Sequence, residues 1–196
     1  MKSLQNLPEE YAEIYSVNLQ KNKKIAVFVN VLAIVIAVVM TVPMHFYIPI
    51  TKLFDMQQGL ISYSIRFIVL SISVALYMVL HELIHGITMK YFGTKKVKYG
   101  FTGMYAFAGS DDYYDKRSYI TIALAPVIVF AVVFAILNAV VPAQWFWVVY
   151  ILQVVNISGA AGDLFVTIKF SKMPKDILVF DYGIGMTVYS KTMNLK

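Results

Sequence analysis

Long runs of apolar residues, separated by short polar segments, dominate the chain. Four of these runs are long enough to cross a membrane: residues 25–44, 60–89, 119–141 and 145–168. A hydrocarbon core of about 30 Å requires roughly 20 apolar residues in an α-helix. The pattern therefore predicts an all-α integral membrane protein with four transmembrane helices, in which residues 1–196 form a single membrane domain.

The first apolar run differs from a secretory signal in the segment that precedes it. That segment is long for such a signal and carries Glu9, Glu10 and Glu13, and no small-residue cleavage site follows the run. We therefore expect the run to be a retained anchor. The second run is longer than one crossing needs, and Arg66 near its start is expected to reach outward, which leaves residues 67–89 embedded.

Lys and Arg gather on one side of the predicted topology. Apart from Lys52 and Arg66, the basic residues lie before the first run, between the second and third runs, or after the fourth. They are Lys2, Lys21, Lys23, Lys24, Lys90, Lys95, Lys96, Lys98, Lys116, Arg117, Lys169, Lys172, Lys175, Lys191 and Lys196. Loops rich in Lys and Arg stay on the cytoplasmic side of a membrane. The chain is therefore predicted to be a multi-pass protein of the cell membrane, with cytoplasmic tails at residues 1–24 and 169–196.

The connection between the second and third runs has a pattern of its own. Val97, Tyr99 and Phe101 alternate with more polar positions, and glycines punctuate the segment. Alternation with a period of two is typical of a half-buried strand. We expect a small β-hairpin-like element at the membrane interface here, and a further strand at residues 177–180 in the C-terminal tail.

Composition narrows the class of protein. Hydrophobic residues make up 59% of the chain and charged residues only 14%, against about 25% charged residues in soluble domains. There is no cysteine, which excludes disulfides, thiolate zinc sites and iron–sulfur clusters. The net charge of +6 comes without a basic stripe outside the apolar runs, so the expected partner is the lipid bilayer and not a nucleic acid.

The second apolar run contains three ionisable residues within five positions, in the order His81-Glu82-Leu83-Ile84-His85. Residues four apart lie on one face of a helix, so the two imidazoles can bind one metal ion while Glu82 lies beside them. H-E-x-x-H on a helix is the signature of zinc peptidases, in which the carboxylate takes a proton from the attacking water. The predicted cofactor is Zn²⁺, with Glu82 as the catalytic residue.

A zinc peptidase site needs a third protein ligand, and Asp163 is the leading candidate. Besides Glu82 it is the only acidic residue in an apolar run. On ideal helices His81 and His85 lie roughly 13 and 8 Å before Lys90, and Asp163 lies roughly 9 Å before Lys169, so all three reach a similar depth.

Asn156 precedes Asp163 by about two helical turns and is expected to point the same way as possible polar support. The small residues at 158–162 would allow a neighbouring helix to approach closely.

Two other interpretations of the polar residues stay open. The buried polar residues could form a hydrogen-bonded cluster that only joins helices. Asp111, Asp112 and Asp115 could bind a hard cation, although a solvated loop is the simpler reading of that cluster.

The motifs at 81–85 and at Asn156-x-x-Gly159-x-x-x-Asp163 resemble those of the intramembrane site-2 proteases. More closely, the chain resembles the putative zincin peptidase family of small bacterial membrane proteins, over about residues 67–170. Gly159 stands where site-2 proteases usually have Pro, and Leu164 where they have Gly. The resemblance implies zinc held by His81, His85 and Asp163, and Glu82 as general base.

The function predicted from these features is zinc-dependent hydrolysis of peptide bonds within the membrane or at its edge, near the cytoplasmic side. The expected substrate is a membrane-anchored protein or peptide. The alternative is a non-enzymatic membrane metal-binding protein, either a carrier or an inactive protease-like scaffold. A helix-bundle subunit without any metal is a third reading. Glu82 favours the enzyme, because a carrier needs no general base beside two histidine ligands.

Overall fold

The structure is a computed structural model that describes residues 3–18, 20–103 and 105–192. Lys2 and Lys196, used above for the orientation, lie outside these residues. Four helical segments are long and apolar enough to cross a membrane: α1 (Lys23–Tyr47), α2 (Gly59–Tyr91), α3 (Lys116–Val140) and the segment Ala143–Ser171. Each agrees with a predicted run to within one helical turn. The orientation in the membrane stays a prediction.

The fourth segment is divided where the sequence predicted one continuous helix. It consists of a short 3₁₀ turn, η2 (Ala143–Trp145), then α4 (Phe146–Gly159) and α5 (Ala161–Ser171). The hydroxyl of Ser158 donates to the carbonyl of Val154, 2.7 Å away. A serine that bonds back to the preceding turn in this way often bends a helix, and the glycine that follows favours a helix end. As a result a new helix starts directly before Asp163.

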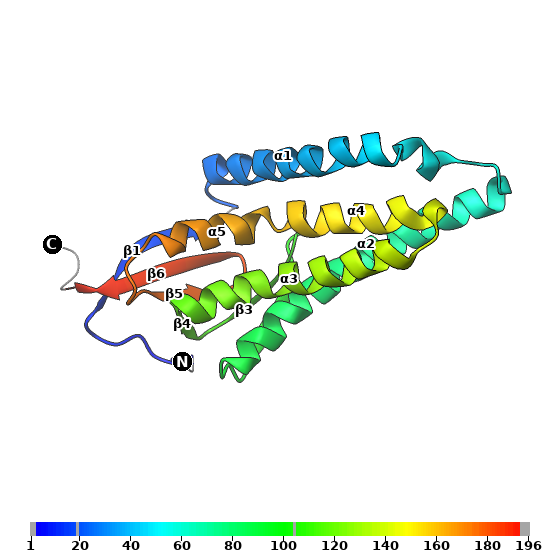
Figure 1. Cartoon of the computed structure of the whole chain (residues 1–196). Coiled ribbons are helices and arrows are strands. Elements are labelled where there is room, and N and C mark those ends of the chain that lie inside the picture. Colours follow the sequence, from blue (N-terminus) through cyan, green and yellow to red (C-terminus); the bar gives the residue numbers. More distant parts are fainter. Residues whose placement is uncertain (1–2, 19, 104, 193–196) are drawn as a thin grey trace. The chain divides into compact units, whose positions relative to one another are not determined.

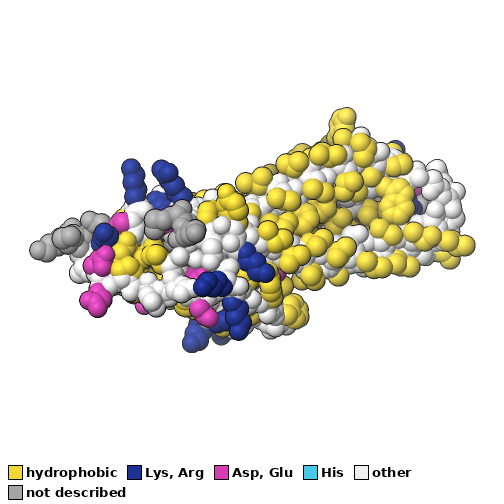
Figure 2. Space-filling view, turned by 90° about the horizontal axis from the view of Figure 1, so that it is seen from below, with side chains coloured by type: hydrophobic (Ala, Val, Ile, Leu, Met, Phe, Trp, Pro, Cys, Tyr) yellow, Lys and Arg dark blue, Asp and Glu magenta, His cyan; other side chains and the backbone are white. Residues whose placement is uncertain are grey.

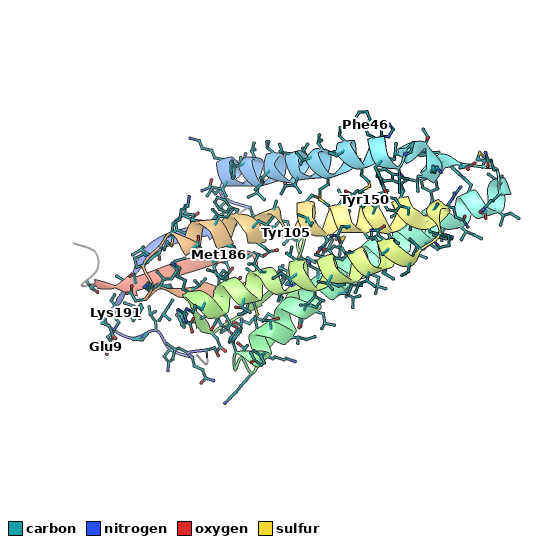
Figure 3. The ribbon with its side chains drawn as sticks, viewed as in Figure 1. Glu9, Phe46, Tyr105, Tyr150, Met186 and Lys191 are labelled. Atoms are coloured by element: carbon teal, nitrogen blue, oxygen red, sulfur yellow. The ribbon has the colours of Figure 1, made fainter. Side chains whose placement is uncertain are left out.

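The described residues divide into two compact units. The helical unit comprises residues 29–80 and 127–162, and the sheet unit comprises the described parts of 1–28, 81–126 and 163–196. In the helical unit Trp147 is buried, and its indole N–H donates to the carbonyls of Ile48 and Pro49. Tyr150 of α4 donates its hydroxyl to the Met40 carbonyl of α1, 3.0 Å away (Figure 3). These bonds join α4 to α1 and to the connection that follows it.

Arg66 extends towards the connection between α1 and α2, at the end of α2 that the sequence predicted, but its side chain is buried there and does not lie in solvent. Only 3% of this residue is exposed, and its guanidinium donates to the carbonyls of Lys52 and Asp55. These carbonyls belong to the connection after α1, which contains the short helix η1 (Ile50–Phe54). The charge is satisfied by backbone oxygens because the connection folds over it, which avoids the cost of an exposed charge in an apolar run.

Exposed apolar side chains cover much of the molecular surface (Figure 2). Phe46 of α1 is 82% exposed, and Ile61 of α2 is 78% exposed. A soluble monomer rarely exposes large contiguous apolar patches. This surface is compatible with a membrane protein.

The tails are not simple extensions of the helices, and the prediction of an all-α protein was wrong in this respect. In the sheet unit β1 (Tyr11–Asn18), β6 (Gly185–Lys191), β5 (Leu178–Asp181) and β4 (Tyr113–Asp115) form an antiparallel sheet in that order (Figure 1). The strand predicted at 177–180 is β5, shifted by one residue. β5 pairs with β6 on one side and with β4 on the other, and β6 in turn pairs with β1 from the opposite end of the chain.

The sheet packs against the helix ends that carry the predicted site residues. Its core joins side chains of α2, α3, α5 and three strands: Met89, Tyr114, Tyr119, Ile122, Ala123, Val166, Phe170, Ile177, Val179 and Val188. Burial of apolar area contributes about 25 cal/mol per Å², so this cluster stabilises the sheet unit. It fixes the three helices relative to one another close to the histidine motif.

The β-hairpin expected between the second and third helices is present. β2 (Val97–Phe101) pairs antiparallel with β3 (Ala106–Ser110), with Tyr99 opposite Ala108. β2 coincides with the predicted alternating segment. Its place at a membrane interface stays a prediction.

Replacement of Gly109 by alanine should destabilise the sheet unit. A Cβ at this position would collide with the backbone of Tyr182 and Gly183, which cannot move as freely as a side chain. We expect a loss of about 1–3 kcal/mol, as for other overpacked sites. Gly162→Ala is the control, because nothing lies near its Cβ and alanine favours a helix by up to about 1 kcal/mol. Thermal unfolding in detergent measures both, and an equal Tm for the two variants would contradict the packing described here.

Candidate metal centre

The two histidines of the motif lie one turn apart on α2 and face each other. Both are 8% exposed, and their ring centroids are 4.9 Å apart. The Nε2 atoms of His81 and His85 are separated by 3.2 Å. Burial of two imidazoles at this separation is favourable only where a proton or a cation lies between them, since both nitrogens otherwise present lone pairs.

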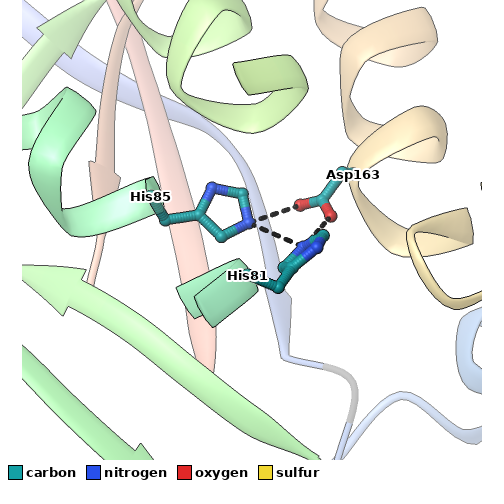
Figure 4. A group of neighbouring side chains, drawn as sticks. All are labelled: His81, His85 and Asp163. Carbon is teal, nitrogen blue, oxygen red and sulfur yellow. Dashed lines mark hydrogen bonds and ion pairs between the residues drawn. The ribbon is translucent and has the colours of Figure 1, made fainter. Parts of the chain in front are cut away.

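Asp163 completes the cluster from α5 (Figure 4). One carboxylate oxygen lies 3.5 Å from Nε2 of His81, and the other lies 3.7 Å from Nε2 of His85. Asp163 stands in the first turn of α5, where the helix dipole favours a negative charge. The helix break after Gly159 therefore determines which turn of the segment presents a carboxylate to the histidines.

The separations fit a zinc ion. With bonds of about 2.0–2.1 Å in a tetrahedron, neighbouring ligand atoms lie roughly 3.3 Å apart. The observed separations of 3.2, 3.5 and 3.7 Å bracket that value. Two imidazoles and one carboxylate also leave a fourth position for water or substrate, as catalytic zinc sites do. Among the described residues this is the one group of His, Asp and Glu side chains close enough together to hold a metal ion.

His85 is oriented by a bond on the far side of its ring. Nδ1 lies 2.9 Å from the carbonyl oxygen of Ile122 in α3. A carbonyl only accepts, so Nδ1 carries the proton and Nε2 presents its lone pair towards His81 and Asp163. Metal-bound histidines almost always donate their other N–H in this way.

Glu82 is half-buried and lies next to the hairpin. Its carboxylate accepts a bond from the backbone amide of Ala108 in β3 and interacts electrostatically with both histidines. Tyr99, which pairs with Ala108, packs its hydroxyl against Gly86 of α2. The hairpin is thereby held against the turn of α2 that carries the motif.

Asn156 belongs to the helical unit, and the hydrogen bonds described for its side chain lie there. Its amide oxygen accepts from Tyr77, and its amide nitrogen donates to the carbonyl of Val127. The residue is fully buried. These bonds join three helices, and a role for Asn156 in support of the metal centre stays a prediction.

The three aspartates before α3 have separate structural partners. Asp115 caps α3, since its carboxylate accepts from the amides of Arg117 and Ser118. Asp111 forms an ion pair with Lys98, 2.5 Å away. Asp112 accepts from the hydroxyl of Ser3. Asp111 is exposed, as expected for a solvated loop, whereas Asp112 and Asp115 are partly buried. Among the described residues the three aspartates do not come together as a cation site.

Sequence reasoning did not identify the pair formed by Tyr119 and Asp181 in the same unit. The Tyr119 hydroxyl donates to one oxygen of Asp181, 2.8 Å away, and the amide of Gly183 donates to the other. Burial raises the pKa of the Asp181 carboxyl above its ordinary value, and the two donors oppose that shift. In the sequence, the only signal for this pair was an aspartate directly after a predicted strand.

This donor set, with two histidines one turn apart on a helix, a glutamate between them and a distant carboxylate, is the one that H-E-x-x-H zinc peptidases use. Residues 74–178 match the family described as "Putative zincin peptidase". The chain belongs to that family.

One curated protein of no stated activity is similar to part of the chain. An "Uncharacterized 24.7 kDa protein in gap 5'region" of Pyrococcus woesei is 37% identical over 117 residues, which are 57% of this chain and 50% of that protein. The chain thus spans about half the length of the curated relative it matches. No solved structure matches this one.

Zinc binding should depend on all three residues of the cluster. We expect about one zinc per chain, and His81→Ala or Asp163→Ala should weaken binding by more than the roughly 10–100-fold that follows loss of an outer-shell partner. Metal analysis and chelator competition measure this.

Two matched variants serve as controls for zinc binding. His45 bonds to the Ile50 amide in the helical unit, and Asp111 pairs with Lys98, so His45→Ala and Asp111→Ala should retain the metal. Retention of wild-type affinity by Asp163→Ala would exclude Asp163 as a ligand.

Asp181 should make stability depend on pH. Since its folded pKa lies above the unfolded value of about 3.9, the folded state holds the proton over the interval between them. The free energy of unfolding therefore falls as the pH rises through that interval. Asp181→Asn keeps an oxygen that accepts from Tyr119 but has no carboxyl group that titrates. The difference between the Tm of this variant and that of wild type should therefore shift in favour of the variant as the pH rises. Thermal unfolding of metal-free protein tests this, and parallel curves would contradict it.

Proposed function

We propose that this protein is a zinc-dependent peptidase that cleaves membrane-associated proteins at the edge of the membrane, on the cytoplasmic side. The single observation that carries the proposal is the convergence of His81, His85 and Asp163 with Glu82 on the adjacent position of α2. Membership of the zincin peptidase family supports the same reaction class.

The chain's own residues supply a complete set of functions for hydrolysis. His81, His85 and Asp163 would hold the ion, and zinc would supply Lewis-acid polarisation of the scissile carbonyl together with acidification of water. Glu82 takes the proton from the attacking water and delivers it to the leaving amine. The Ala108 amide that bonds to Glu82 orients this carboxylate before substrate binds.

The position of the site favours the edge of the membrane over its centre. The sheet unit contains the site, both β-sheets and the basic residues of the central connection, including Lys95, Lys96 and Lys98. Irregular backbone and strand edges occur at membrane depth only where protein or water satisfies them. If the positive-inside rule holds, this side is cytoplasmic. The likeness to site-2 proteases in the two motifs supports a membrane-anchored substrate.

The alternative is a metal-binding membrane protein without catalysis, either a carrier or an inactive protease-like scaffold. Such a protein would bind the metal with the same three ligands, and it would not need Glu82. Glu82 lies half-buried beside the ligands and is held by a backbone amide. This placement favours a role in the reaction over that of a solvated side chain with no part in it. The two functions predict different results for one variant, Glu82→Gln.

Glu82→Gln should retain zinc and lose peptide hydrolysis. Glutamine keeps the size of the side chain but cannot accept a proton, so we expect the rate to fall by about 10²–10⁴-fold. The assay uses full-length protein in vesicles with a single-span reporter protein, and cleavage is followed together with zinc content.

Glu13→Gln is the matched control, because Glu13 lies on β1 with an exposed side chain. Its cleavage rate should equal that of wild type. Cleavage at the wild-type rate by Glu82→Gln would refute the catalytic role. Wild type that binds zinc but cleaves no reporter would favour the carrier or scaffold.

A further inference from the structure

Pro126 interrupts the hydrogen bonding of α3 at one defined place. In an α-helix the amide of each residue donates to the carbonyl four positions earlier. Proline has no amide hydrogen, so Pro126 leaves the carbonyl of Ile122 without its usual donor. The side chains of Pro126 and Ile122 are both fully buried, so bulk water does not replace that donor.

The carbonyl that Pro126 releases is the one that binds His85. Nδ1 of His85 lies 2.9 Å from the Ile122 oxygen in a buried contact. Transmembrane helices tolerate proline when a neighbouring helix supplies a donor to the freed carbonyl. Here the donor is the imidazole of a candidate zinc ligand. One contact thus satisfies both a buried carbonyl and a buried ring nitrogen.

Packing holds the two partners in place. Ile122 belongs to the same buried cluster as Met89, which lies one turn after His85 on α2. The distance between the carbonyl and the ring is therefore set by side chains on both helices and does not depend on the metal.

We propose that Pro126 is a positioning residue that fixes the tautomer and ring orientation of His85 by keeping the Ile122 carbonyl free. The carbonyl forces the proton onto Nδ1, and Nε2 then presents its lone pair to the same point as Nε2 of His81 and the Asp163 oxygen. The inference rests on the proposed zinc site, and it assigns to a proline on α3 a function in a site whose ligands lie on α2 and α5.

Pro126→Ala restores the amide that proline lacks. That amide competes with His85 for the Ile122 carbonyl. The imidazole can then rotate or change tautomer. The matched control is Pro43→Ala, which restores an amide inside α1 in the same way.

The first measurement is zinc affinity, by competition with a chromogenic chelator on full-length protein in detergent. We expect Pro126→Ala to bind zinc about 10–100-fold more weakly, as for loss of an outer-shell partner, and Pro43→Ala to match wild type. Equal affinity of Pro126→Ala and wild type would overturn the proposal and leave the zinc peptidase intact.

The second measurement is made on the wild type and uses a variant only to assign one signal. In wild type labelled with ¹⁵N-histidine, with the His85 signal assigned from His85→Ala, NMR should report a protonated Nδ1 both with and without zinc. A metal-free His85 that carries its proton on Nε2 and none on Nδ1 would overturn the proposal. A wild type that shows protonated Nδ1 but binds no zinc would overturn the proposed function instead, so the two failures are distinguishable.

Discussion

The structure depends on one constraint, which is that two imidazoles and a carboxylate lie within an otherwise apolar set of helices. On translocon scales a single charged residue at the centre of a membrane helix costs roughly 2.5–3.5 kcal/mol. His81, His85 and Asp163 meet at 3.2 to 3.7 Å, so one proton or cation between them can satisfy all three. The helix break before α5 and the free Ile122 carbonyl of α3 both help to position these three side chains.

The sheet unit provides the rigid support that such a site requires. The core side chains Met89, Phe170 and Val179 join α2, α5 and β5 in one cluster. Catalytic groups held to within a fraction of an ångström depend on this kind of packing. Strands from both ends of the chain, β1 and β6, complete the sheet. Since the site's helices pack on the sheet, the two tails form part of the unit that holds the candidate metal centre.

Local patterns predicted the spans, the hairpin at Val97–Phe101 and the convergence of the histidines, because each depends on a period within one segment. The similar depth of Asp163 and the two histidines along their helices was enough to select Asp163 as the candidate for the third ligand. The β1–β6 pair was missed because its residues lie more than 160 positions apart and no local period links them. The bond from His85 to Ile122 was missed for a related reason, since a proline shows which carbonyl is free but not which side chain reaches it.

A metal ion that joins α2 and α5 at this cluster would have a defined ligand shell, which zinc-edge X-ray absorption of the purified protein measures. We expect two imidazole nitrogens at about 2.0–2.1 Å and carboxylate or water oxygen at about 2.0–2.2 Å in a four-coordinate shell. The absence of cysteine excludes sulfur from that shell. A shell with fewer than two imidazoles, or a protein that retains no zinc, would contradict the account.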